Sequence, residues 1–255
     1  MSEGSPPGGS LLVVTAIGDE ARAFCRGMTG RLLPRSLSSG SGLAVRTPAM
    51  DVVWVGPGRA GLDRIAGALS SGHYDRVLFT GLAGALAPDL SPGTLLAAEE
   101  VVTADGERVP VLLPPALGLF AEESPAVAPL RRGRILSSDR LVGTPSEKLR
   151  LYEQTGAMAV DMESSGWLSV TRRAGIPASL IRAVSDGAEE PLPPELLSFV
   201  TEEGDLALSS TLRALLFRPA LLIALISLGP SLRRGRQGLS RLGGAIFDSL
   251  GREGR

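Results

Sequence analysis

The chain has 255 residues, of which 44% are hydrophobic, and a formal net charge of −1. This length allows one large α/β domain or two small ones, and the hydrophobic share is sufficient for a sizeable core. The nearly neutral charge gives no reason to expect a nucleic acid as partner.

The first ten residues, MSEGSPPGGS, contain neither the positive region nor the apolar segment of a secretory signal. We therefore predict a disordered lead-in over residues 1–10. Cys25 is the single cysteine, which excludes an intrachain disulfide and suits a reducing cytoplasm. With His73 as the single histidine, neither a zinc site nor a Ser–His–Asp triad is expected.

Apolar runs rich in β-branched residues alternate with helix-like stretches from residue 11 to residue 190. By length and composition the runs predict strands over 11–17, 43–47, 51–56, 76–86, 94–104, 133–138, 157–162 and 178–185. Helices are predicted over 19–28, 59–72 and 163–174. This alternation predicts an α/β domain over 11–190, in which helices flank a central mixed β-sheet.

The composition changes after Pro194, and we predict a C-terminal helical extension over 191–255. Its longest apolar run, Ala220 to Ile226, is much shorter than the roughly 20 residues that span a bilayer. An apolar face at helical spacing is formed by Leu239, Leu242, Ile246 and Leu250. Two interpretations stay open: a helical appendage packed on the domain, or a basic amphipathic surface in contact with anionic lipid.

Gly18, Glu163 and Asp186 each stand where a predicted strand ends. In open α/β sheets, ligands bind beyond the carboxyl ends of the strands. A carboxyl group in a partly desolvated cleft can act as a general acid, which contributes about 10²–10⁴ in rate. A second, ionised carboxylate can accept hydrogen bonds from sugar hydroxyls or stabilise a cationic transition state. Acids at strand ends are common in α/β proteins, so these residues alone leave the function open.

Five stretches together resemble the nucleoside phosphorylase and nucleosidase superfamily, in its order and with its spacing. They are TAIGDEARAF (15–24), VLFTGLAGALAPDLSPGTLLAAEEVV (77–102), GRILSSDRLV (133–142), AVDMESSGW (159–167) and IPASLIRAVSDGA (176–188). The resemblance implies a central mixed sheet that binds a nucleoside and an activity that breaks its glycosidic bond. It also implies a homo-oligomer, without a metal or an organic cofactor.

The resemblance assigns roles to residues in the last two stretches. Glu163 would accept hydrogen bonds from the ribose hydroxyls, and Asp186 would protonate or hydrogen-bond the purine at N7. Asp161 is predicted to be structural. Further contacts would come from Met162 at the ribose, from Ser185 beside Asp186, and from Leu141 and Val142 along the base.

The attacking nucleophile follows from the stretch after the first strand. Gly18, Asp19 and Arg22 resemble the phosphate-binding loop of bacterial purine nucleoside phosphorylases, whereas hydrolytic relatives have a glutamate where this chain has Gly18. A glycine at a helix start lets an oxyanion approach the backbone N–H groups. Phosphorolysis is therefore predicted, with inorganic phosphate as co-substrate bound by Gly18, Arg22 and either Arg59 or an arginine from a neighbouring subunit.

Two features keep hydrolysis open. Phosphorylases of this type carry an arginine and a serine where this chain has Phe79 and Leu82. In addition, Glu20 is an acid that could activate water after a shift of its loop. The hydrolytic alternative is a nucleosidase acting on methylthioadenosine, S-adenosylhomocysteine or a futalosine-like nucleoside. A third hypothesis is a protein that binds a nucleoside without cleaving it.

The C-terminal third narrows the resemblance. DMESSGW, VSDGAEEPLPPELLSF and LRALLFRPALLIAL resemble the hopanoid-associated phosphorylases of bacteria. This implies cleavage of adenosylhopane with release of adenine in hopanoid biosynthesis. Because that nucleoside is linked to a lipid, we predict a cytoplasmic enzyme that contacts the inner membrane surface through its C-terminal region.

Overall fold

The computed structural model describes residues 10–28, 42–56, 58–71, 73–114, 125–128, 130–193 and 219–253. The predicted lead-in lies outside these residues except for Ser10, and so does the start of the C-terminal region at 194–218.

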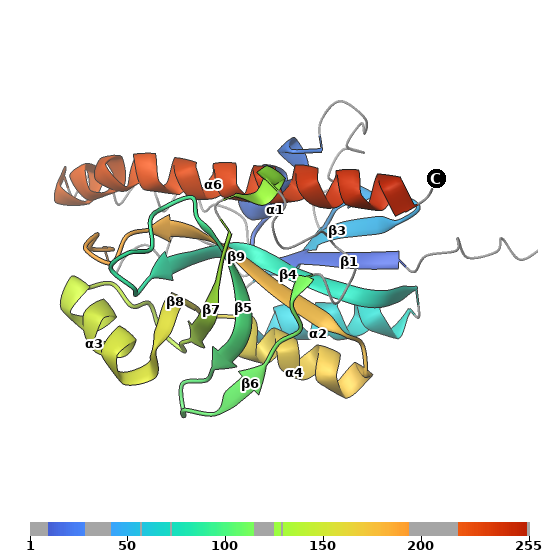
Figure 1. Cartoon of the computed structure of the whole chain (residues 1–255), viewed down its shortest axis with the longest axis horizontal. Helices are drawn as coiled ribbons and strands as arrows, with labels where there is room; N and C mark the ends of the chain where they lie inside the picture. The colour runs from blue at the N-terminus through green and yellow to red at the C-terminus, as the bar shows by residue number, and fades with distance from the viewer. Residues whose placement is uncertain are drawn as a thin grey trace, which may run out of the picture.

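Within the described residues, nine strands form one sheet (Figure 1). They are β1 (Ser10–Thr15), β2 (Leu43–Arg46), β3 (Met50–Trp54), β4 (Tyr74–Ala85), β5 (Leu95–Val102), β6 (Arg108–Pro110), β7 (Leu130–Ser137), β8 (Ala157–Asp161) and β9 (Ala178–Asp186). The order is β2-β3-β1-β4-β8-β7-β5-β6, and β9 pairs with both β4 and β5.

The sheet mixes parallel and antiparallel pairs, as predicted. β1 runs parallel to β3 and β4, whereas β4 is parallel to β9 and antiparallel to β8. β7 is parallel to β5 and β8, and β5 is antiparallel to β9. β4, β8, β7, β5 and β9 therefore pair in a closed ring. Within this ring, β4 also pairs with β1, and its carboxyl end lies between those of β8 and β9.

Helices cover both faces of the sheet (Figure 1). α1 (Gly18–Arg26) and α6 (Pro219–Glu253) pack on one face, and α2 (Gly58–Ser70) and α4 (Ser164–Ala174) pack on the other. A 3₁₀ turn, η2 (Pro125–Val127), contacts α6. The predicted α/β class, its eight strands and its three helices over 11–190 are confirmed.

Sequence patterns missed α3 (Pro145–Thr155), beside β8, and the short β6. α3 has little apolar periodicity, and its buried residue is Lys148. Its ends nevertheless carry clear signals. Thr144 caps the first turn by accepting the N–H of Glu147, and Gly156 ends the helix with φ 67°.

The described part of α6 is packed into the domain. Leu239, Leu242 and Ile246 are fully buried in one core cluster with Phe24 of α1 and Leu11 of β1. Of the two interpretations of the C-terminal region, the packed appendage describes this segment. Within the described ranges, none of the helices has the length and apolarity that crossing a membrane requires. Contact with a membrane surface stays a prediction.

Candidate active site

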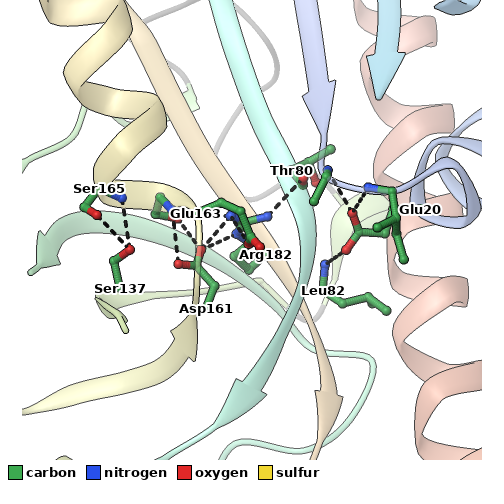
Figure 2. Close-up of polar contacts among 11 residues, drawn as sticks. Glu20, Thr80, Leu82, Ser137, Asp161, Glu163, Ser165 and Arg182 are labelled. Carbon is green, nitrogen blue, oxygen red and sulfur yellow. Dashed lines mark hydrogen bonds and ion pairs between the residues drawn. The ribbon is translucent and has the colours of Figure 1, made fainter. Parts of the chain in front are cut away.

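Arg182 of β9 lies fully buried at the centre of the site (Figure 2). Its guanidinium donates to Asp161 Oδ2 at 2.6 Å, to the carbonyl of Thr80 at 3.1 Å and to Ser164 Oγ at 3.1 Å. The guanidinium also lies 4.9 Å from the ring centroid of Trp167. Burial opposes its charge, but the neighbouring carboxylates outweigh burial and raise the pKa of Arg182.

Asp161, the last residue of β8, is the buried carboxylate that accepts a hydrogen bond from Arg182. It is 6% exposed and also accepts hydrogen bonds from the backbone N–H and the hydroxyl of Ser164. These contacts fix the turn from β8 into α4. They agree with the structural role that was predicted for this carboxylate.

Glu163 follows at the start of α4, and its side chain keeps 18% of its surface exposed. Its Oε2 lies 3.9 Å from Arg182 Nη2. Burial and the nearby charge of Asp161 raise the pKa of Glu163 to about 7, although Arg182 counteracts them. Glu163 is therefore a carboxyl group at the edge of the site that can change its protonation state near neutral pH.

Glu20, in the first turn of α1, reaches the same place from the other side (Figure 2). Its carboxylate accepts the backbone N–H groups of Leu82 at 2.8 Å, Ala16 at 3.1 Å and Ile17 at 3.2 Å. Burial raises its pKa, against the opposing effects of Arg182 and of these N–H donors. Glu20 thus lies inside the site without any shift of its loop.

These four residues, Glu20, Asp161, Glu163 and Arg182, form what we call the Arg182 cluster. Three carboxyl groups share one guanidinium, so negative charge is in excess when all are ionised. An excess of this kind can stabilise a cation that forms during a reaction. Among the described residues, no group of three or more His, Cys, Asp and Glu side chains is arranged to hold a metal ion.

A second charged centre lies further along β9. Asp186 is 3% exposed, and its Oδ2 lies 2.6 Å from Nζ of the fully buried Lys148. Ser185 Oγ donates to the other oxygen, Oδ1, at 2.5 Å. We call Lys148 and Asp186 the Lys148 pair. Ser185 thus lies against the carboxyl group that it was predicted to support, and its role at the base stays a prediction.

Two glycines of β4 make room for the two centres. A Cβ atom at Gly81 would lie 2.6 Å from Arg182 Nη1 and 2.9 Å from Glu20 Oε1, and one at Gly84 would lie 3.0 Å from Asp186 Oδ2. Any side chain at either position would therefore displace a charged group. Gly81 and Gly84 of β4 thus lie opposite Arg182 and Asp186 of β9 in one parallel pair of strands.

The remaining predicted ribose and base contacts border these centres. Met162 is 36% exposed beside Glu163, whereas Leu141 is half-buried and Val142 is buried. The loop after β9 lies against this segment, because the N–H of Leu192 donates to the carbonyl of Gly143. Their contacts with a nucleoside stay predictions.

The three predicted phosphate ligands differ in their exposure to solvent. Gly18 is buried at the start of α1, whereas Arg22 and Arg59 are exposed. Phe79 packs on Trp167, with ring centroids 5.2 Å apart, and the N–H of Leu82 already donates to Glu20. The role of Gly18, Arg22 and Arg59 in binding phosphate stays a prediction.

Two residues of the site had no predicted role. Arg182 is the charged residue inside the strand ASLIRAVS, and Lys148 is the single lysine of the chain. A charge within a buried strand needs a counter-charge, and this signal could have pointed to Arg182. Lys148 offers no such signal, because its helix looks like a solvated one.

The chain is similar in sequence to several known proteins. The family model of the phosphorylase superfamily matches residues 11–216. An aminodeoxyfutalosine nucleosidase of Helicobacter pylori is 30% identical over 131 residues, which cover 45% of this chain and 57% of that protein. A futalosine hydrolase of Streptomyces coelicolor is 31% identical over 198 residues, which cover 69% of this chain and 83% of that protein.

Solved structures share the fold. A 5′-methylthioadenosine/S-adenosylhomocysteine nucleosidase of Neisseria meningitidis superposes with a TM-score of 0.66 at 18% identity, covering 93% of this chain and 97% of its own. The corresponding enzyme of Helicobacter pylori gives a TM-score of 0.60 at 19% identity, covering 96% and 98%. The family match spans most of the domain that carries the Arg182 cluster and the Lys148 pair, and the chain therefore belongs to the phosphorylase superfamily.

Proposed function

We propose that this protein hydrolyses the N-glycosidic bond of a 5′-substituted adenosine and releases adenine. The observation that carries the proposal is Glu20, whose carboxylate lies in the Arg182 cluster and close to Glu163. The names of the relatives support the same class, because the curated ones are a nucleosidase and a hydrolase.

Each charged group has a task in this reaction. Water attacks C1′ of the ribose, the C1′–N9 bond breaks, and its electron pair passes to the purine. Glu20 takes a proton from the water, and Asp186 gives a proton to N7 of the departing base. Water is thereby divided between the sugar, which gains the hydroxyl, and the purine, which gains the hydrogen. Both carboxyl groups then exchange a proton with solvent.

The Arg182 cluster suits the transition state of this step. Cleavage of a glycosidic bond builds positive charge on the ribose ring. Glu163 accepts hydrogen bonds from the ribose hydroxyls, and the excess negative charge around Arg182 stabilises the ring cation. Because burial raises the pKa of Glu20, its carboxylate is a stronger base than an exposed one.

The contacts of Glu20 favour water over phosphate as the nucleophile. The N–H groups of Ala16 and Ile17, directly before α1, and of Leu82, on β4, already donate to this carboxylate. A phosphate in the same place would have to displace Glu20 or lie beside it, where like charges repel. Phosphorolysis through Gly18 and Arg22 is the competing proposal that the assay below separates from hydrolysis.

Four nucleosides with different 5′ groups are candidate substrates. The names of the curated relatives suggest a futalosine-type nucleoside, whereas the C-terminal resemblance to hopanoid-associated phosphorylases suggests adenosylhopane. The nucleosidases among the solved structures add methylthioadenosine and S-adenosylhomocysteine. All four are nucleosides with a substituted 5′ carbon, so the proposed chemistry is the same for each.

The test is base release from each nucleoside with and without inorganic phosphate, with the sugar product identified by mass. Hydrolysis predicts a free sugar at a rate that does not depend on phosphate. A pentose 1-phosphate formed only with phosphate would establish phosphorolysis. Absence of base release from all four nucleosides would contradict the proposal.

Replacing Glu20 tests its role directly. Glu20→Gln keeps the shape of the side chain but cannot take a proton from water, so hydrolysis should fall by about 10²–10⁴-fold. Initial rates of adenine release measure the loss. Glu153→Gln, the same change at an exposed position of α3, should leave the rate unchanged. An active Glu20→Gln protein would exclude Glu20 as the base.

A further inference from the structure

Lys148 is a buried cation for which the site described so far has no use. It is fully buried, on a helix whose other side chains are exposed or half-buried. Nζ lies 2.6 Å from Asp186 Oδ2, 2.8 Å from the carbonyl of Gly187 and 2.8 Å from the carbonyl of Glu190. All three N–H donors of the ammonium group are thereby engaged.

Burying a lysine without a task is costly, because the charge must be removed from water. Here the charge meets the carboxyl group that faces the purine in the proposed reaction. We infer that Lys148 is a positioning residue for Asp186: it fixes the orientation of that carboxyl group and stabilises the carboxylate that remains after N7 is protonated. This inference rests on the proposed function.

The chemistry of leaving-group departure explains why a cation belongs there. When the proton passes from Asp186 to N7, a negative charge appears on a carboxylate that is 3% exposed. Water cannot solvate that charge well, so proton transfer would be unfavourable without a counter-ion. Lys148 supplies the counter-ion on Oδ2, and Ser185 supplies a hydrogen bond on Oδ1.

The same ammonium group also organises the loop after β9. It donates to the carbonyls of Gly187 and Glu190, and the Glu190 carboxylate accepts the N–H of Gly187 at 2.9 Å. The other oxygen of Glu190 accepts the hydroxyl of Ser231, on α6, at 2.7 Å. The orientation of Asp186 is thus linked, through Lys148 and Glu190, to the C-terminal helix.

The test compares an ordinary 5′-substituted adenosine with its N7-methylated counterpart. The methylated purine is already positively charged and leaves without receiving a proton. Lys148→Met should slow cleavage of the ordinary nucleoside by about 10²-fold, and of the methylated one by less than about tenfold. Asp186→Asn should show the same selectivity. A Lys148→Met protein that loses both activities alike, or neither, would overturn the positioning role.

A double variant covers the case in which Lys148→Met alone does not fold, since it leaves a buried carboxylate without its partner. Lys148→Met with Asp186→Asn removes both charges together. If Lys148 acts through Asp186, the double variant should cleave the ordinary nucleoside as fast as Asp186→Asn alone. A further tenfold or larger loss would overturn the inference.

The two proposals fail in different ways. If the unmodified protein releases a purine from neither nucleoside, the proposed function fails and the role of Lys148 falls with it. If the unmodified protein cleaves both and the selectivity of the variants is absent, only the role of Lys148 is overturned.

Discussion

The Arg182 cluster and the Lys148 pair each have one member on β9, Arg182 and Asp186, and each has a fully buried cation, yet their charges are arranged differently. Arg182 faces three carboxyl groups, whereas Lys148 faces one carboxyl group and two backbone carbonyls. In the cluster, burial together with like charge raises the pKa of Glu163 to about 7. In the pair, the one ammonium group matches the one carboxylate that remains after Asp186 has given its proton to the purine.

This difference suits two tasks. A cluster with surplus carboxylates gains when a positive charge develops nearby, as in the ribose ring of the proposed reaction. A matched pair has no surplus, and it keeps one carboxyl group in a fixed orientation. The comparison can be tested by removing each charge in turn and measuring stability and activity separately.

Removing Arg182 should have the largest effect on stability. Arg182→Met leaves Asp161 without its cation at the centre of the protein, and loss of one partner of a buried ion pair costs about 3–5 kcal/mol. Chemical denaturation should record this decrease in the free energy of unfolding. Arg173→Met, on the exposed side of α4, is the control and should change it by less than about 0.5 kcal/mol. Equal effects of the two would mean that Arg182 does not balance the cluster.

The pH dependence of stability should show that the carboxylate of Glu163 is the one that Arg182 does not balance. In the folded protein its pKa is about 7, against 4.5 for the ordinary carboxyl group, so the folded state binds more protons than the unfolded state between these values. Stability should therefore decrease as the pH rises from about 4.5 to about 7, by roughly 3 kcal/mol.

Glu163→Gln should abolish this decrease and make the protein more stable than the unmodified one at pH 8, while cleavage is lost. Denaturation at pH 5 and at pH 8 measures the difference. The same change at the exposed Glu153 should leave the pH dependence intact. If Glu163→Gln instead lowers stability at pH 8, its carboxylate is balanced and the comparison with the Lys148 pair fails.

The fold was predictable because its signals are local. The apolar runs at 11–17, 76–86 and 178–185 and the alternation with helices identify the sheet, and the five family stretches point to Glu163 and Asp186 as candidate site residues. Contacts between residues that are far apart in the sequence were not predictable in the same way. Lys148 meets Asp186 across 38 positions, and Glu20 meets Leu82 across 62, so both contacts depend on the tertiary structure.

The packing of the C-terminal helix was also not predictable from the sequence. The spacing of Leu239, Leu242 and Ile246 predicts an apolar face but not what covers it. In the structure these side chains lie against α1 and the sheet, because glycines let the helices approach closely. At Gly27, directly after α1, a Cβ atom would lie 1.8 Å from the carbonyl oxygen of Ser240 of α6. A sequence pattern alone cannot distinguish this packing from a lipid-facing surface.

The close approach of α6 gives the next prediction, because the Lys148 pair is linked to that helix. A Cβ atom at Gly243 would lie 2.1 Å from the carbonyl oxygen of Phe24, so Gly243→Ala must push α6 away from α1. Overpacking of this kind costs about 1–3 kcal/mol. Gly229→Ala, in the same helix with nothing within 4 Å, should stabilise by up to about 1 kcal/mol. Thermal denaturation of both variants measures the contrast, and destabilisation by both would show that α6 does not pack as described.

The smallest effect is expected at Ser231, where α6 meets the loop that Lys148 organises. Ser231→Ala removes one hydrogen bond to Glu190, which contributes about 1 kcal/mol to stability. Because that loop carries two of the three acceptors of Lys148, a small loss of activity should accompany it on the ordinary nucleoside and be absent on the N7-methylated one. Ser249→Ala, on the same helix, is the matched control. Equal loss of activity on both nucleosides would mean that α6 stabilises the fold but does not help to orient Asp186. The Lys148 pair would then differ from the Arg182 cluster in its balance of charge, and not in a link to the C-terminal helix.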